Sequence, residues 1–193
     1  NDGRWNEGDT GEHFAHVVKG KGLNVEKGIC VKLGVGHMLS ACFDTKSLSY
    51  RAVWQDGWVN FQPFRWGSSR GANIDGKTWF SIPKAEMPKG GEYLGLLRFG
   101  KRVVFEYRIG DTKIQDEPWA GKNSFYRKID ILSPVEKLSL PCMVIDDSIK
   151  VVVVESQGIE KTEWKQEEIV LTQANLGASI IIRISREREP AEE

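Results

Sequence analysis

Aromatic side chains are the residues in this sequence best suited to binding a ligand. They crowd the first half of the chain, as Trp5, Trp54, Trp58, Phe61, Phe64, Trp66 and Trp79. An exposed flat ring on a sheet can stack on the apolar face of a pyranose. Trp54 belongs to an alternating apolar series, so we expect it in the core. The predicted ligand-binding residues are Trp58, Trp66 and Trp79, together with Asp56 in a turn, and the predicted ligand is carbohydrate.

Carboxylates offer a second kind of chemistry. Glycoside hydrolysis needs two of them facing each other across about 5 to 9 Å. Asp44 at a strand end and Asp56 in a turn also have structural explanations. A carbohydrate-active enzyme with a carboxylate pair therefore stays open as an alternative. The candidates are Asp44, Asp56, Asp75, Glu106, Asp116, Glu117, Asp146 and Asp147.

Other catalytic motifs are weak or absent in the sequence. His13 and His16 are spaced i, i+3, and His37 lies apart, whereas a metal site needs three or four converging ligands. We expect polar surface histidines, no metal and no cofactor. There is no G-x-S-x-G nucleophile elbow, and the glycines of Gly34–Gly36 lie between two strands, where they predict a hairpin turn. These absences favour a non-catalytic module.

The overall charge argues against two classes of partner. The 193 residues contain 27 Lys+Arg and 27 Asp+Glu, so the chain lacks the basic surface that nucleic acid or an anionic membrane would require. No apolar run reaches the roughly 18 to 20 residues of a membrane span, so none is expected. There is no charged-then-apolar leader at Asn1, and a mature secreted chain would look the same.

The three cysteines do not form a known motif. Cys30, Cys42 and Cys142 include no C-x-x-C pair and no C-x-x-C-H haem attachment site. Cys30 and Cys42 lie in two strands that could form a hairpin. A disulfide between them and buried free thiols are both open.

A period of two dominates the chain and predicts antiparallel strands. Val103, Phe105, Tyr107 and Ile109 share one face, and Gly100 and Gly110-Asp111 supply the turns of two hairpins on either side. Asp56-Gly57 is predicted to form a tight hairpin turn. No stretch has sustained helical spacing, and residues 160–170 are the best candidate. The fold class is therefore all-β, a large antiparallel β-sandwich or distorted barrel of about eleven strands with little or no helix.

Composition also divides the chain. Residues 1–22 are predicted to form a polar N-terminal extension, residues 23–185 a single β-sandwich domain, and residues 186–193 a charged C-terminal tail. No internal repeat or low-complexity linker is present.

Two segments carry a resemblance to a known family. The first contains KGICVKLG (27–34), ACFDT (41–45), LSYRAVW (48–54) and Gly57-Trp58, and the second contains YLGL (93–96), VVFEYRIG (103–110) and FYR (125–127). Together they resemble an uncharacterised β-domain of large secreted bacterial proteins that also carry sugar-dehydrogenase-like propeller and c-type cytochrome domains. The resemblance covers residues 23–132.

The resemblance implies a periplasmic or secreted accessory module in sugar oxidation or electron transfer. The expected partner is carbohydrate or a protein, such as a cytochrome or a sugar dehydrogenase. This chain has neither the propeller nor a haem attachment motif, so neither activity is carried over. Besides the binding module and the carboxylate enzyme, a structural subunit of a haem-containing redox assembly remains a third hypothesis.

Overall fold

The computed structural model describes residues 10–61, 71–142, 149–165 and 168–186. These residues form fourteen β-strands and no helix, which confirms the predicted all-β class. None of the described segments is an apolar helix that could cross a membrane. The chain divides into two compact units, residues 1–87 and 88–193, and each unit contains one seven-stranded sheet. A single domain over residues 23–185 stays a prediction, since two compact units can fold cooperatively.

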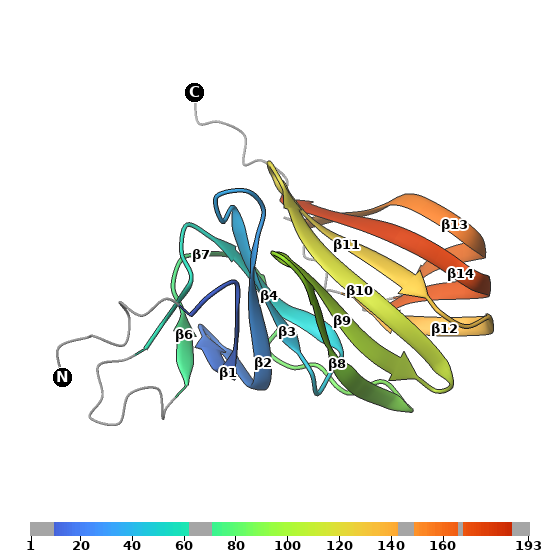
Figure 1. Cartoon of the computed structure of the whole chain (residues 1–193), viewed down its shortest axis with the longest axis horizontal. Helices are drawn as coiled ribbons and strands as arrows, with labels where there is room; N and C mark the ends of the chain where they lie inside the picture. The colour runs from blue at the N-terminus through green and yellow to red at the C-terminus, as the bar shows by residue number, and fades with distance from the viewer. Residues whose placement is uncertain (1–9, 62–70, 143–148, 166–167, 187–193) are drawn as a thin grey trace. The chain divides into compact units, whose positions relative to one another are not determined.

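The sheet of the first unit has the strand order β5-β6-β1-β2-β3-β4-β7. Figure 1 labels β1 to β4, β6 and β7 of this sheet. Its pairs are antiparallel except β1 with β6, which is parallel. The strands are β1 (His13–Gly20), β2 (Leu23–Leu33), β3 (Leu39–Asp44), β4 (Ser49–Gln55), β5 (Val59–Asn60), β6 (Ala72–Ile74) and β7 (Lys77–Ser81).

This first sheet must curl. β6 and β7 are separated by four strands in the sheet, yet only Asp75 and Gly76 join them. In a flat sheet, five steps of about 4.8 Å would separate the two strands by about 24 Å. Three Cα steps reach only about 10 Å. The two edges therefore approach each other, and a Cβ on Gly57 would lie 2.1 Å from the carbonyl oxygen of Asp75.

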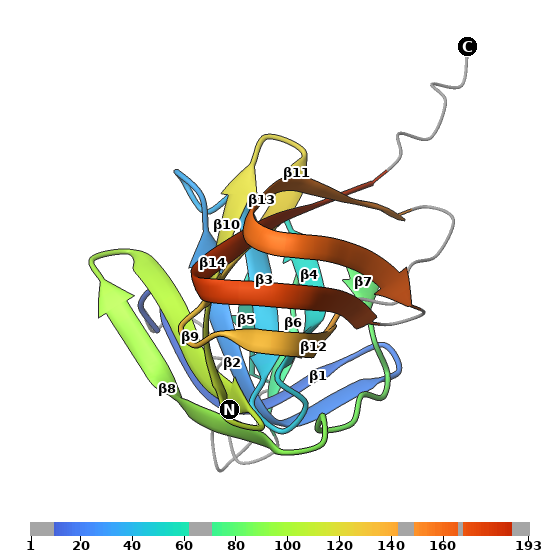
Figure 2. The same ribbon diagram turned by 90° about the vertical axis from the view of Figure 1, so that its right-hand side faces the viewer.

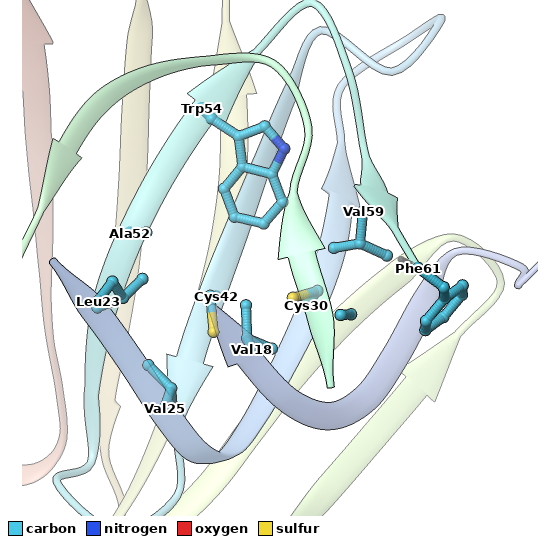
Figure 3. Close-up of a cluster of buried hydrophobic side chains, with 10 residues drawn as sticks. Val18, Leu23, Val25, Cys30, Cys42, Ala52, Trp54, Val59 and Phe61 are labelled. Atoms are coloured by element: carbon cyan, nitrogen blue, oxygen red, sulfur yellow. The ribbon is translucent and has the colours of Figure 1, made fainter. Parts of the chain in front are cut away.

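The curled sheet encloses a hydrophobic core cluster that Figure 3 shows. Trp54 is fully buried in it, as its alternating series predicts. Since β1 to β6 all contribute, the cluster fills the concave side of the curl. Its members are Val18, Leu23, Val25, Cys30, Cys42, Ala52, Trp54, Val59, Phe61 and Ala72.

The sheet of the second unit has the order β12-β14-β11-β10-β9-β8, with β13 also paired to β14. Figure 2 shows β13 and β14 as long curved ribbons. The predicted hairpins around Gly100 and Gly110 are confirmed as β8–β9 and β9–β10. The strands are β8 (Gly91–Phe99), β9 (Arg102–Ile109), β10 (Thr112–Gly121), β11 (Ser124–Ile131), β12 (Val135–Pro141), β13 (Ile149–Lys165) and β14 (Glu168–Arg186).

The described residues of the segment 160–170, the best candidate for a helix in the sequence, are strand, because β13 and β14 pair along it. Two local predictions differ from the structure. β1 lies within residues 1–22, which were expected to form a polar extension. Asp56 has a positive φ of 59°, but β4 and β5 do not pair with each other, so Asp56-Gly57 is not a hairpin turn. It is the connection at which the curled sheet brings its edges together.

Candidate functional site

The most distinctive sequence motif, FDT followed by LSYR, forms a buried polar centre in the first unit. The Asp44 carboxylate accepts hydrogen bonds from the Lys46 backbone N–H (2.9 Å), the Ser47 hydroxyl (3.1 Å) and Arg51 Nη1 (2.8 Å). Leu48 completes the turn with a φ of 53° and a bond from its N–H to the Asp44 carbonyl. These contacts use the carboxylate to close the β3–β4 turn.

A β-bulge directs Arg51 toward this carboxylate. Cys42 pairs with Ala52 and Phe43 pairs with Tyr50, so Arg51 is the extra residue of β4. Its Nε donates to the Ile82 carbonyl (2.8 Å) and its Nη2 to the Pro83 carbonyl (2.6 Å). The guanidinium thus links the turn to the segment that follows β7. Buried charge needs such pairing, so the motif has a structural role.

The second unit has its own buried polar centre. Arg127 Nη2 donates to Asp116 Oδ2 (2.5 Å), Arg127 Nη1 donates to the Pro141 carbonyl (3.1 Å), and the Tyr107 hydroxyl donates to Asp116 Oδ2 (3.2 Å). Burial, followed by the Asp116 charge, raises the pKa of Tyr107 well above its ordinary value. Burial opposes the charge on Arg127, but Asp116 and Tyr107 outweigh it and raise its pKa. The Asp116 carboxylate therefore links β9, β10 and β11 and has a structural role.

Two of the four predicted ligand-binding residues are joined through Gln55. Trp79 Nε1 donates to Gln55 Oε1 (2.7 Å), and Gln55 Nε2 donates to Asp56 Oδ2 (3.0 Å). Val53 pairs with Phe80 and Trp54 with Thr78, so Trp79 is the bulged residue of β7. Trp79 is half-buried and Asp56 is exposed.

The other two predicted residues are differently placed. Trp58 stacks on Trp54 with ring centroids 6.2 Å apart, and Lys32 Nζ lies 5.2 Å above its ring. Its Nε1 donates to the Thr10 hydroxyl (2.6 Å). Trp58 is thus held by internal contacts and is half-buried. Trp66 lies outside the described residues. Ligand binding at the four residues stays a prediction.

A serine–histidine contact beside Trp58 is structural. His37 Nε2 lies 2.6 Å from Ser40 Oγ, and that hydroxyl donates to the Gly57 carbonyl (3.0 Å). Because Ser40 has one proton and gives it to the carbonyl, His37 Nε2 must be the donor to Ser40. The histidine cannot then accept the serine proton as a base would.

The two N-terminal histidines have different local surroundings. His16 Nδ1 accepts from the Val17 backbone N–H (2.8 Å), and its ring stacks on Phe14. His13 Nδ1 is buried without a hydrogen-bond partner. Within the described part of the chain, no three His, Cys, Asp or Glu residues are grouped to hold a metal ion.

Sequence reasoning missed an open face on the sheet of the second unit. In β10, β11 and β14 the alternate residues are buried, including Ile114, Ile129 and Ile182. The residues between them are all half-exposed, and nearly all are polar or aromatic. We call this set the open face: Gln115, Glu117, Trp119, Tyr126, Lys128, Asp130, Ser179, Ile181, Arg183 and Ser185.

An aromatic–arginine row crosses the open face. Trp119 pairs with Tyr126, and Tyr126 pairs with Arg183 across β10, β11 and β14. The Trp119 and Tyr126 rings are stacked, with centroids 5.0 Å apart and planes 4° apart. Arg183 Nε is buried and has no hydrogen-bond partner. The sequence did contain a signal for this row, since a two-residue turn at Lys122-Asn123 places residues 119 and 126 opposite each other.

Charges around this row are unevenly paired. Glu117 is bound by Arg102 through two hydrogen bonds of 2.6 Å, and Lys128 is bound to Asp130 at 2.8 Å. Lys150 on β13 pairs with Ser185, which places it on the same face. No described carboxylate forms an ion pair with Arg183 or Lys150. Among the residues that the structure describes, the end of the face near the aromatic pair therefore has an excess of positive charge.

One comparison with known proteins gives a match. Residues 41–116 match the family model of a domain of unknown function, DUF6797. This agrees with the expectation of an uncharacterised β-domain. No curated protein and no solved structure matches the chain. The matched span includes the Asp44–Arg51 centre, Asp56, Trp58 and Trp79, and ends at Asp116, before Trp119 and Tyr126.

Proposed function

We propose that this chain is a non-catalytic accessory module that binds carbohydrate on its open face. The observation that supports the proposal is the Trp119–Tyr126–Arg183 row, which places stacked rings beside an arginine on a half-exposed sheet surface. Aromatic rings offer apolar area to a sugar ring, and neighbouring polar groups bind its hydroxyls.

The charge pattern specifies the proposal further. Arg183 and Lys150 lie without described acidic partners near the aromatic pair. A carboxylate on a sugar would form charge-assisted hydrogen bonds with an arginine and satisfy its donors. We therefore expect sugars with an anionic group, such as uronic acids, to bind more tightly than neutral ones.

Five described carboxylates are unsuited to act as the acid of a glycosidase. Asp44 and Asp116 are buried, and each is held by an arginine. Gln115 and Lys113 lower the pKa of Glu106, and lysines lower the pKa of Glu26 and Glu163. A glycosidase acid needs the opposite, a raised pKa that keeps its proton near neutral pH.

The setting of the module also remains a proposal. The resemblance to β-domains of secreted sugar-dehydrogenase and cytochrome proteins suggests a periplasmic or secreted location. There, a binding face would hold a polysaccharide near a partner that oxidises its sugars. The module itself would need no cofactor for that role.

Glycan binding by the full chain tests the proposal. A panel of neutral and uronate-containing oligosaccharides is screened, and hits are measured by calorimetry. Trp119→Ala and Arg183→Ala should each weaken binding at least about tenfold, the loss expected for a central contact residue. Tyr126→Phe should bind nearly as well as the parent, since it keeps the ring.

Trp79→Ala is the matched comparison, because it removes a half-buried tryptophan of the other unit, one that the sequence predicts to bind ligand. If the open face is the binding site, this variant should leave the affinity unchanged. Circular dichroism establishes that each variant folds. Failure of every glycan to bind, or equal losses from Trp79→Ala and Trp119→Ala, would contradict the proposal.

A further inference from the structure

Cys30 and Cys42 are direct neighbours across β2 and β3. Their Cα atoms are register partners, and both side chains are fully buried in the cluster shown in Figure 3. Both thiols are free in the structure. Residues directly opposite in an antiparallel pair point to the same face of the sheet, so the two sulfur atoms occupy the same side of the core.

The backbone pattern identifies the type of pair. The Lys32 N–H donates to the Glu12 carbonyl, on the β1 side of β2. Since N–H groups alternate in direction along a strand, the Cys30 N–H also points away from β3. On the β3 side of β2, the Thr45 N–H donates to the Lys27 carbonyl, so Lys27 and Thr45 form a hydrogen-bonded pair. Hydrogen-bonded and non-hydrogen-bonded pairs alternate along two antiparallel strands. Cys30–Cys42 is therefore a non-hydrogen-bonded pair.

This position suits a cross-strand bridge. Cα atoms in a non-hydrogen-bonded pair are about 4.5 Å apart, within the range of about 4.4 to 6.8 Å that a disulfide spans. Rotation about the Cα–Cβ bonds can bring the sulfur atoms together without moving the strands. Cys42 Sγ now lies 2.9 Å from where a Cβ on Gly28 would be, so the glycine leaves room for this sulfur.

We propose that Cys30 and Cys42 form a disulfide when the chain folds in an oxidising compartment, and that the folded core then preserves the redox state in which it closed. In this reaction a protein or small-molecule disulfide is the oxidant. One cysteine thiolate attacks it to form a mixed disulfide and releases one thiol. The second cysteine attacks that intermediate, forms the Cys30–Cys42 bond and releases the other thiol. The pair loses two protons and two electrons, and the oxidant gains both.

Burial explains why the state would be preserved after folding. The thiolate is the attacking species in exchange. Burial, and then the neighbouring Cys42, raise the pKa of the Cys30 thiol well above its ordinary value. With both side chains at 0 % exposure, neither an oxidant nor a reductant reaches the sulfur atoms unless the sheet opens. Cys142, the third cysteine of the chain, lies in the other unit and serves as the internal control.

Refolding under two redox conditions tests the proposal. The full chain is unfolded in urea with reductant and refolded either with oxidised and reduced glutathione or with reductant alone. Trypsin then releases residues 28–32 and 33–46 as separate peptides from the reduced protein. After oxidative refolding, mass spectrometry should find these two peptides joined. Protein that has folded reduced and then meets the same glutathione mixture should keep both thiols for at least about tenfold longer than the refolding protein does.

Two variants keep the outcome decisive. Cys142→Ser should still form the bridge, and Cys30→Ala should lose it and leave Cys42 free. Separate peptides after oxidative refolding, or a bridge that includes Cys142, would overturn the disulfide. Equal oxidation rates for the folded and refolding protein would overturn the preserved state. If Cys30→Ala does not fold, the peptides and the oxidation rates of the parent chain still decide whether the disulfide forms and whether folding preserves the redox state.

Discussion

Among the described residues, each unit buries one arginine–aspartate pair. The pair of the first unit connects a turn to a segment outside the sheet, and the pair of the second unit connects neighbouring strands. Asp44 and Arg51 are seven residues apart, with both side chains 5% exposed. Arg51 extends the contact to the carbonyls of Ile82 and Pro83, outside the sheet ladder. Asp116 and Arg127 lie on adjacent strands at 0% and 1% exposure, inside the sheet.

The two pairs differ in how completely water is excluded from them, and therefore in the cost of removing the arginine. A buried ion pair contributes little net stability beyond an apolar pair of similar volume, but removal of one partner leaves an uncompensated charge. In the first unit, Asp44 would keep two other donors, from Lys46 and Ser47. In the second unit, Asp116 would keep the Tyr107 hydroxyl among its donors, but its side chain is 0% exposed, against 5% for Asp44. A charge sealed further from water costs more to leave without its cation. The second pair should therefore be the more costly to break.

The largest effect is expected from Arg127→Met. It leaves the Asp116 carboxylate buried without its cation and should lower the free energy of unfolding by about 4 kcal/mol. Urea denaturation followed by circular dichroism measures the loss. The double variant Asp116→Leu with Arg127→Met should recover most of it, because no charge is left buried. A loss below about 1 kcal/mol in the single variant would show that water reaches this centre.

Arg51→Met should cost somewhat less, about 3 kcal/mol, because the Asp44–Arg51 pair is less completely buried than Asp116–Arg127. Hydrogen exchange measured by mass spectrometry shows where each variant loosens the structure. Arg51→Met should raise exchange first in β3 and β4, and Arg127→Met in β10 and β11. If both variants loosen both units equally, the chain folds as one domain, as residues 23–185 were predicted to do, and the comparison between units loses its thermodynamic meaning.

The same contrast explains what the sequence could predict. The period of two in β9, β10 and β11 is visible because one face of that sheet stays half-exposed. In β3 and β4 nearly every side chain is buried, so alternation overstated how exposed one face would be. The short strands β6 and β7 were missed because their pairing depends on the curl of the sheet, which no local pattern encodes.

The candidate surface was less predictable than the fold. Tryptophans were chosen by their density in the first half of the chain, and Trp58 proved to be engaged with Trp54, Lys32 and Thr10. Arg183 is 57 residues beyond Tyr126 in the sequence and becomes its neighbour only when β14 pairs with β11. Such a non-local neighbour cannot be derived from spacing. The glycan test at Trp119 is therefore the part of the function that depends most on the structure.

Tyr107→Phe tests the second centre more gently. It removes the hydroxyl that donates to Asp116 and leaves the arginine in place, so we expect a loss of about 1.5 kcal/mol, the value typical of a hydrogen bond to a charged group. Ser47→Ala is the counterpart in the first unit, where the hydroxyl donates to Asp44. Its expected loss is about 1 kcal/mol, because Ser47 lies in a turn that can rearrange. Urea midpoints of the two variants measured side by side check the order.

The smallest expected effect is a loss of stability in mild acid, which should arise in the first unit and not at the buried centre of the second. The raised pKa values of Tyr107 and Arg127 keep the protonation of both groups constant near neutral pH. In the first unit, burial and then the Lys32 charge lower the pKa of His37, opposed by Glu12. The unfolded chain therefore binds a proton at this position at a higher pH than the folded chain does.

Stability from His37 should be complete above the ordinary histidine pKa of about 6.5 and decline as the pH falls through that value toward the lower folded pKa. His37→Asn removes this dependence, and asparagine tolerates the positive φ of 59° at residue 37. Urea midpoints are measured between about pH 7.5 and pH 5, a window that spans the ordinary histidine pKa. As the pH falls, the midpoint should decrease more steeply for the parent than for the variant. The two proteins differ only at residue 37, so the difference between the two curves isolates His37. Parallel curves would mean that the ring is solvated in the folded chain, and that mild acid does not distinguish the first unit from the second.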